Sequence, residues 1–146
     1  EGKEGRDPAE EAREHSAVTA PMTLNVMWLW ISAAAALGSW AVHTFVGGRQ
    51  IVPQLLASGL ADMPKYVLYF VWHIATVLLL AIAAGYALAA AYSPLWPLAV
   101  AATVVNAAIA ALIAMVAITR RVPFRDMPQW TLFLLVAALG AAAIWL

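Results

Sequence analysis

No lysine, arginine, aspartate or glutamate occurs between Tyr66 and Thr119 of this chain. Uncharged apolar runs of about 18 residues or more are typical of helices that cross a lipid bilayer. The composition agrees, because 64% of the residues are hydrophobic and only 11% are charged. A water-soluble domain is about a quarter charged, and its interior is too small to bury so much apolar surface. The sequence therefore predicts an integral membrane protein.

The apolar runs are rich in alanine, and they do not alternate between apolar and polar residues. Strands of membrane barrels are about ten residues long and alternate between lipid-facing and lumen-facing side chains. Alanine also favours helices and is depleted in strands. We therefore expect an all-α integral membrane protein, a four-transmembrane-helix bundle with spans at residues 24–46, 64–91, 98–118 and 128–146.

The segments outside the expected spans carry signals of their own. Gly47-Gly48 predicts a helix stop after the first span, and the run Ser-Pro-Leu-Trp-Pro at 93–97 predicts a tight turn after the second. Pro53 and Gly59 bracket apolar residues in the first loop, which predicts a short interfacial helix. Residues 1–21 hold nine of the sixteen charged residues. We expect them to be a disordered polar tail or an expression remnant, ahead of one transmembrane domain over 22–146.

The basic residues predict an orientation. Arg49 and Lys65 lie in the first loop, Arg120, Arg121 and Arg125 lie in the third, and the turn between them has no basic residue. Cytoplasmic loops of membrane proteins are enriched in Lys and Arg. Both basic loops are therefore expected in the cytoplasm and both termini outside. The alanine content and the preference for Arg over Lys favour a bacterial inner membrane.

A three-residue sequence, Asp-Met-Pro, occurs at 62–64 and again at 126–128. Proline suits the first turn of a helix, and a preceding aspartate can cap its N–H groups, so a shared helix start is the simpler explanation. The alternative is that a helical hairpin has been duplicated. The two hairpins would then be related by an axis along the membrane normal.

Apart from tyrosines and from Lys65 at the very start of the second span, His43 and His73 are the only titratable side chains in the expected spans. Two histidines on facing helices could hold a b-type haem or one metal ion. Helix rise places His43 ~6 Å from Gly47, just after the first span, and His73 ~13 Å from Pro64 at the start of the second. A shared ligand therefore requires one helix to tilt or extend. The alternative is that each histidine bonds a neighbouring hydroxyl or carbonyl.

Three uncharged polar side chains are expected to join helices. Asn106 and Thr103 lie on a face of the third span that is rich in small residues, and Thr76 shares a face of the second span with His73. Small residues let helices approach closely enough for amides and hydroxyls to bridge between them. Asn106 and Thr103 could otherwise line a path for a small neutral solute.

No sequence motif for catalysis, phosphate binding or dinucleotide binding is present, there is no basic block for nucleic acid, and the chain has no cysteine. An enzyme is therefore not expected. The leading hypothesis is a non-enzymatic accessory or assembly subunit, or a homo-oligomer, whose partners are the lipid bilayer and other membrane-protein chains. The alternatives are a haem- or metal-binding redox protein that uses His43 and His73, and a passive channel or carrier for a small neutral solute.

Overall fold

The computed structural model describes the backbone of residues 8–146 and the side chains from Leu24 onward. Every regular element in that part is a helix, which confirms the predicted all-α class. The elements are α1 (Pro8–Ala41), η1 (Val42–Gly47), α2 (Gly48–Gln50), α3 (Val52–Leu56), α4 (Asp62–Ala91), η2 (Ser93–Leu95), α5 (Trp96–Arg120), η3 (Phe124–Asp126) and α6 (Gln129–Trp145). Helix α1 begins within the segment assigned to a polar tail. The expectation of disorder for residues 1–7 lies outside the described residues.

Three helical stretches are long and apolar enough to cross a membrane, which fits the predicted class of membrane protein. They are Leu24–Gln50, Asp62–Ala91 and Ser93–Arg120, and they cover the first three predicted spans, each extended by a few residues. Helix α6 is also apolar but has only 17 residues. Its length of roughly 25 Å is slightly less than the ~30 Å thickness of a hydrocarbon core.

The predicted helix stop at Gly47-Gly48 is wrong. The chain keeps right-handed helical dihedral angles at both glycines, and it continues through η1 and α2 to Gln50. Glycine costs a helix about 1 kcal/mol relative to alanine, which packing can offset. The indole of Trp72 lies directly against Gly47, where an added Cβ would come within 2.9 Å of Trp72 Cη2. Gly47 therefore serves a close approach between two helices.

The connections between the helices agree in part with the predictions made from the sequence. A tight turn does follow α4, since η2 covers Ser93–Leu95 and Pro97 lies in the first turn of α5. A short helix, α3, forms in the first loop as expected. The two Asp-Met-Pro stretches differ, because Asp62 begins α4 whereas α6 begins only after Pro128. Neither helix start has a side-chain capping hydrogen bond, so the expected aspartate caps are wrong.

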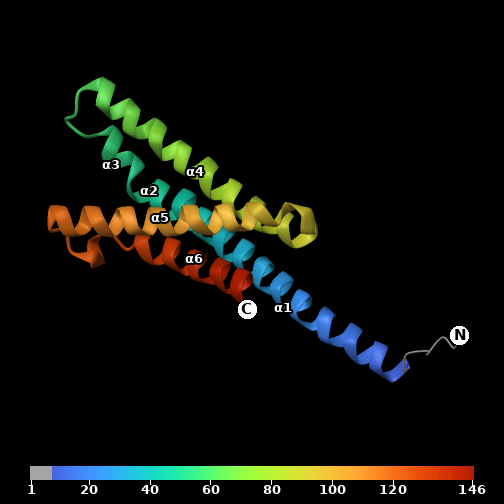
Figure 1. Cartoon of the computed structure of the whole chain (residues 1–146). Coiled ribbons are helices and arrows are strands. Elements are labelled where there is room, and N and C mark those ends of the chain that lie inside the picture. Colours follow the sequence, from blue (N-terminus) through green and yellow to red (C-terminus); the bar gives the residue numbers. More distant parts are fainter. Residues whose placement is uncertain (1–7) are drawn as a thin grey trace, which may run out of the picture.

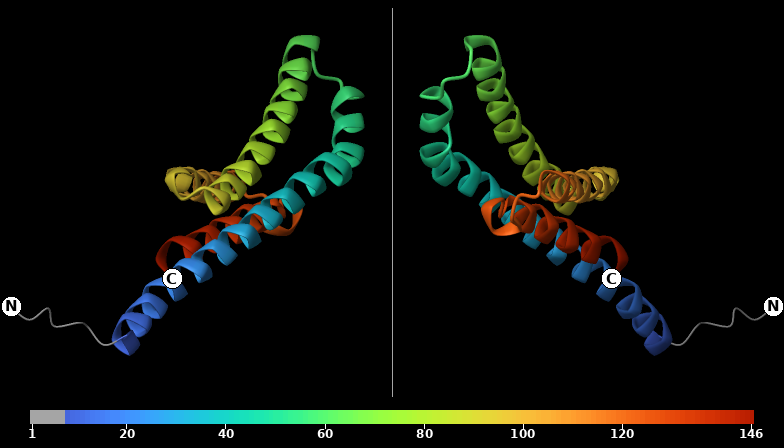
Figure 2. Two further views of the ribbon diagram at one scale, coloured as in Figure 1. Left: turned by 90° about the vertical axis from the view of Figure 1, so that its right-hand side faces the viewer. Right: turned by 90° about the vertical axis from the view of Figure 1, so that its left-hand side faces the viewer.

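The long helices are arranged as two connected pairs (Figure 1). Helix α1 packs against α4 and α6, and α5 packs against α6 and α4. The loop before α4 and the loop after α5 both lie at the left of Figure 1, and the turn at η2 lies at the opposite end of α4 and α5. Figure 2 shows α3 bridging the gap between the end of the first long helix and the start of α4. We call the end with the two loops the basic end, because Arg49, Lys65 and the arginines that follow α5 belong to it.

Small side chains form most of the core where these helices meet. Tyr86 is fully buried at its centre, beside Leu29 and Val136. Contacts between membrane helices depend on close van der Waals packing, which small residues permit. Gly140 of α6 makes the tightest approach, since an added Cβ would overlap the hydroxyls of Tyr86 and Thr103. The remaining buried apolar residues of this cluster are Ala33, Ala36, Ile82, Ala83, Ala89, Ala99, Ala102 and Ala143.

Candidate functional site

A π-helical segment, η1, interrupts the first long helix near its end. The N–H of Gly48 there reaches the carbonyl of His43, five residues earlier. Such segments are rare in proteins and occur frequently at functional sites. His43, Val46 and Gly47 of this segment line a pocket. The Thr44 hydroxyl is buried and has no hydrogen-bond partner among the described residues.

His43 is held against α4 through Trp72. Their rings stack with centroids 4.1 Å apart and planes inclined by 19°. Nε2 of His43 lies 3.3 Å from the Trp72 carbonyl oxygen, which also accepts the Thr76 hydroxyl at 3.1 Å. A carbonyl can only accept, so in the neutral ring Nε2 carries the proton, and Nδ1 is left as an acceptor. Thr76 thus bonds within its own helix, while His43 joins η1 to α4.

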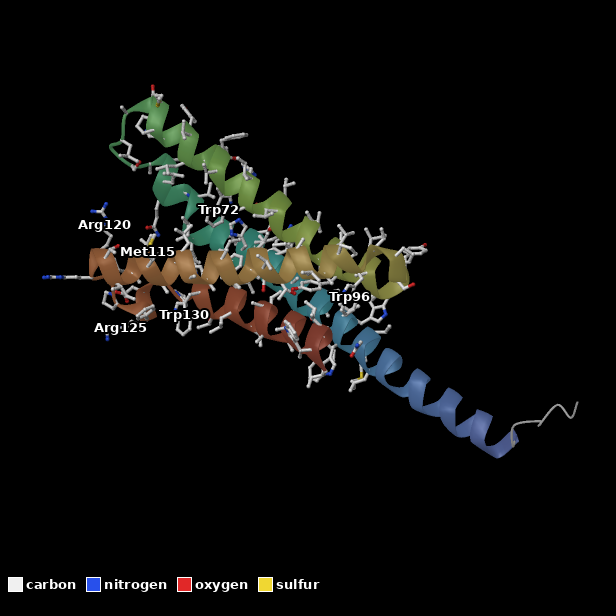
Figure 3. The ribbon with its side chains drawn as sticks, in the orientation of Figure 1. Trp72, Trp96, Met115, Arg120, Arg125 and Trp130 are labelled. Atoms are coloured by element: carbon white, nitrogen blue, oxygen red, sulfur yellow. The ribbon has the colours of Figure 1, made fainter. Side chains whose placement is uncertain are left out.

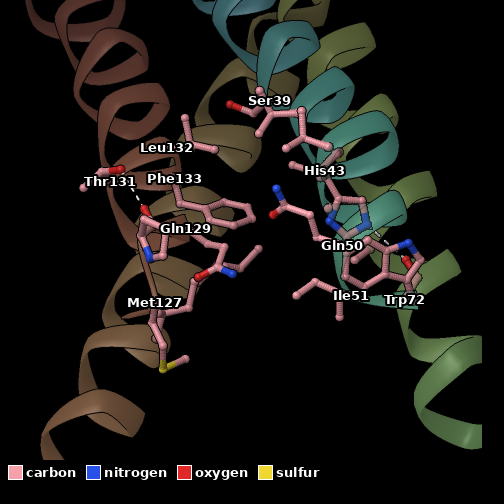
Figure 4. Close-up of a pocket in the computed structure, with 18 residues that line it drawn as sticks. Ser39, His43, Gln50, Ile51, Trp72, Met127, Gln129, Thr131, Leu132 and Phe133 are labelled. Carbon is pink, nitrogen blue, oxygen red and sulfur yellow. Dashed lines mark hydrogen bonds between the residues drawn. The ribbon is translucent and has the colours of Figure 1, made fainter. Parts of the chain in front are cut away.

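The pocket lies at the basic end, with η1 and α2 on one side and the start of α6 on the other (Figure 4). Its volume of about 620 Å³ falls in the range of small-molecule sites, roughly 300–1,000 Å³. Residues of α4 and α5 complete the wall. The apolar lining side chains are Val42, Val46, Ile51, Trp72, Ala75, Leu79, Ile109, Ile113, Met127, Pro128, Leu132 and Phe133.

The polar side chains of this pocket are few and uncharged. Gln50 and Gln129 point into it from opposite walls, as Figure 4 shows, and no hydrogen bond within the described residues occupies either amide. Ser39 and Thr131 also line it, but their hydroxyls donate to the carbonyls of Ala35 and Pro128 at 3.0 and 2.7 Å. With His43, the two glutamines therefore provide the polar groups that are open to a ligand.

His73 does not line this pocket. It lies on another face of α4, in a shallow groove of about 440 Å³. Among the aromatic rings from Leu24 onward, its ring meets that of Tyr69, edge-on at 4.6 Å between centroids. The structure therefore does not bring His43 and His73 to one pocket. Within the described residues, no group of three or more His, Asp or Glu side chains is placed to hold a metal ion. We call the surface formed by Phe70, His73, Ile74, Val77, Leu78 and Ala81 the α4 groove.

Asn106 and Thr103 lie in the core, away from both hollows. The Asn106 amide donates to the Ala102 carbonyl at 2.8 Å, and Thr103 donates to the Ala99 carbonyl at 2.8 Å. Thr103 Oγ1 also lies 2.8 Å from the Tyr86 hydroxyl. Since the single proton of Thr103 is used within its helix, Tyr86 is the donor in that bond. This bond joins α4 to α5, which is the packing role expected for Thr103.

Sequence reasoning alone does not identify the site residues Tyr86, Trp72, Gln50 and Gln129. Tyrosine and tryptophan are ordinary in spans, and polar residues are ordinary beside basic loops. Comparisons of this chain with protein-family models, curated proteins and solved structures gave no match. The function of the chain is therefore inferred from its own residues.

Proposed function

We propose that this chain is a non-enzymatic membrane module that assembles with a second copy of itself through the α4 groove. One observation carries the proposal: His73 is exposed on the outer face of a helix that is long and apolar enough to cross a membrane. The residues beside it on that face are apolar and are also exposed, since Phe70 is 63% and Val77 69% exposed.

The position of His73 along α4 makes this exposure costly in lipid. It is the twelfth residue of a 30-residue helix, roughly 16 Å from the start of a helix ~45 Å long. A hydrocarbon core of ~30 Å centred on this helix would include that position. Polar side chains at this depth nearly always face other protein groups, because lipid tails offer no hydrogen bonds. No described residue hydrogen-bonds the His73 ring, so a second chain is the natural source of a partner.

A second copy of this chain would supply a hydrogen-bond partner for His73, namely its own His73 ring. A neutral imidazole has one N–H donor and one acceptor nitrogen, so two of them can satisfy each other. A two-fold axis along the membrane normal would bring both rings to the same depth, as symmetric dimers commonly do. Ala81, which is small and exposed in the same groove, leaves room for the partner helix to approach.

We also propose that the chain crosses a bacterial inner membrane four times, as a bundle of two duplicated hairpins with α6 as the fourth span. Figure 3 bears on the orientation, since Arg120 and Arg125 lie near one end of α5, whereas Trp96 lies at its other end. The positive-inside rule then puts the basic end in the cytoplasm, α3 at the cytoplasmic interface and both termini in the periplasm.

The orientation can be measured directly because the chain has no cysteine. Ser93→Cys, in the turn η2, is expected to react with a membrane-impermeant thiol reagent applied to intact spheroplasts. Ser58→Cys, in the first loop, should react only after the membrane is opened. Labelling of Ser58→Cys in intact spheroplasts would contradict the orientation.

Assembly is tested by filling the α4 groove. The mass of the protein–detergent complex, measured in mild detergent, should correspond to a dimer for the native chain and to a monomer for Ala81→Trp. Ala108→Trp is the matched control, because Ala108 is an exposed alanine on α5, outside the groove. It should remain dimeric. A native chain that is monomeric, or equal behaviour of the two variants, would overturn the proposal.

A further inference from the structure

We infer that the pocket at the basic end binds an uncharged amphipathic molecule with a flat, oxygen-bearing ring as its head, the chemistry of a quinone or quinol with an apolar tail. This inference goes beyond the proposed assembly, because the pocket and the α4 groove use different faces of α4. Trp72, Ala75 and Leu79 face the pocket, whereas Phe70, His73 and Val77 face the groove.

The polar lining defines the charge of the ligand head. Gln50 and Gln129 each provide N–H donors and a carbonyl acceptor, and His43 keeps Nδ1 as an acceptor once Nε2 is bonded to Trp72. No Lys, Arg, Asp or Glu is among the lining residues. A charged head would therefore find no counter-charge in this lining. A neutral head with oxygens that accept from amides, or hydroxyls that donate to Nδ1, fits this set.

The aromatic side chains define the shape of the head. Figure 4 shows Phe133 of α6 pointing across the pocket toward Gln50 and His43. On the opposite wall, the rings of His43 and Trp72, which both line the pocket, stack on each other. Flat rings pack well against aromatic side chains in offset or edge-on arrangements. A ring-sized head between these walls would be within reach of the glutamines on either side.

The rest of the pocket suits an apolar tail. Leu79, Ile109 and Ile113 contribute from α4 and α5, and Leu79 is only 4% exposed. The pocket lies at one end of helices that are long and apolar enough to span a membrane. A lipid-soluble molecule could therefore enter from the bilayer. The predominance of apolar lining with a few converging polar groups is typical of small-molecule sites.

The test uses the full chain in mild detergent and a benzoquinone carrying a decyl chain as the probe. Saturable stabilisation against thermal unfolding is expected for the native chain. Gln129→Leu and Gln50→Leu should each weaken half-saturation roughly fivefold, the effect of losing about one hydrogen bond. Gln54→Leu is the matched control, because Gln54 lies on α3 outside the pocket. It should bind like the native chain.

Two further probes test the head group. Decanoate carries a charged head on a similar tail, and dioctanoylglycerol carries ester carbonyls without a ring; neither should stabilise the protein in a saturable way. No stabilisation by the quinone, equal stabilisation of all variants, or equal binding of either control amphiphile would overturn the inference. Ala81→Trp should bind the quinone like the native chain, so failure of assembly and failure of binding are separately visible.

Discussion

Gly140→Ala is expected to lower the free energy of unfolding by roughly 2–3 kcal/mol, since overpacking a tight core forces side chains and backbone to shift. A Cβ at this position would overlap the hydroxyls of Tyr86 and Thr103, which are hydrogen-bonded to each other. Tyr86 is fully buried and cannot swing outward without opening the contact between α4 and α5. The change is measured by unfolding in mixed micelles of rising denaturing-detergent content, followed by helical circular dichroism.

Gly38→Ala is the control for this experiment. Gly38 is also inside a helix, but nothing lies within 4 Å of an added Cβ. Alanine is the better helix former by about 1 kcal/mol, so this variant should be as stable as the native chain or more so. The double variant Tyr86→Phe/Gly140→Ala should recover part of the loss, because one of the two overlapping oxygens is removed. Equal stabilities of the two alanine variants would show that α6 does not pack as described.

Tyr86→Ala is expected to cost more, about 3–5 kcal/mol, because it leaves a large cavity in the core. The side chain lies in the cluster of alanines where α1, α4, α5 and α6 meet, and it bonds Thr103 on the neighbouring helix. Tyr86→Phe keeps the ring and removes only that hydrogen bond. It should cost roughly 0.6–1 kcal/mol, as single hydrogen bonds between membrane helices do.

Tyr66→Ala provides the comparison, since Tyr66 lies on the same helix but is 59% exposed. Its loss should change the free energy of unfolding by less than about 1 kcal/mol. The same detergent titration distinguishes the three variants. If Tyr86→Ala unfolds at the detergent content of the native chain, Tyr86 is not the centre of the core.

The helices themselves could be predicted because long uncharged runs leave few alternatives. The residues at which the helices begin and end could not be predicted in the same way. Gly47 by itself predicts the end of a helix. In the structure its missing side chain leaves room for the indole of Trp72, a residue distant in sequence. Asp62 and Asp126 stand where capping residues belong, yet neither caps its helix. Whether a glycine ends a helix or an aspartate caps one depends on the residues packed against it, which become known only with the fold.

The site was predictable only in part for the same reason. His43 and His73 were identified as polar residues inside spans, and both lie in surface hollows. His43, on η1, stacks on Trp72, whereas His73 lies in the α4 groove, and no spacing in the sequence indicates which face of α4 meets η1. Gln50 and Gln129 are 79 positions apart by their residue numbers, and only the packing of α1 against α6 brings them to one pocket.

The measurement that most directly tests assembly through α4 is cysteine cross-linking in native membranes. The chain has no cysteine, so a single introduced thiol can pair only with another chain. Val77→Cys, one turn from His73 in the α4 groove, should form a disulfide-linked dimer under mild oxidation, because facing α4 helices can bring the two Cα atoms within about 7 Å. Val104→Cys, 61% exposed on α5, should stay monomeric. Cross-linking at Val104 but not at Val77, or at neither position, would contradict a dimer built on α4.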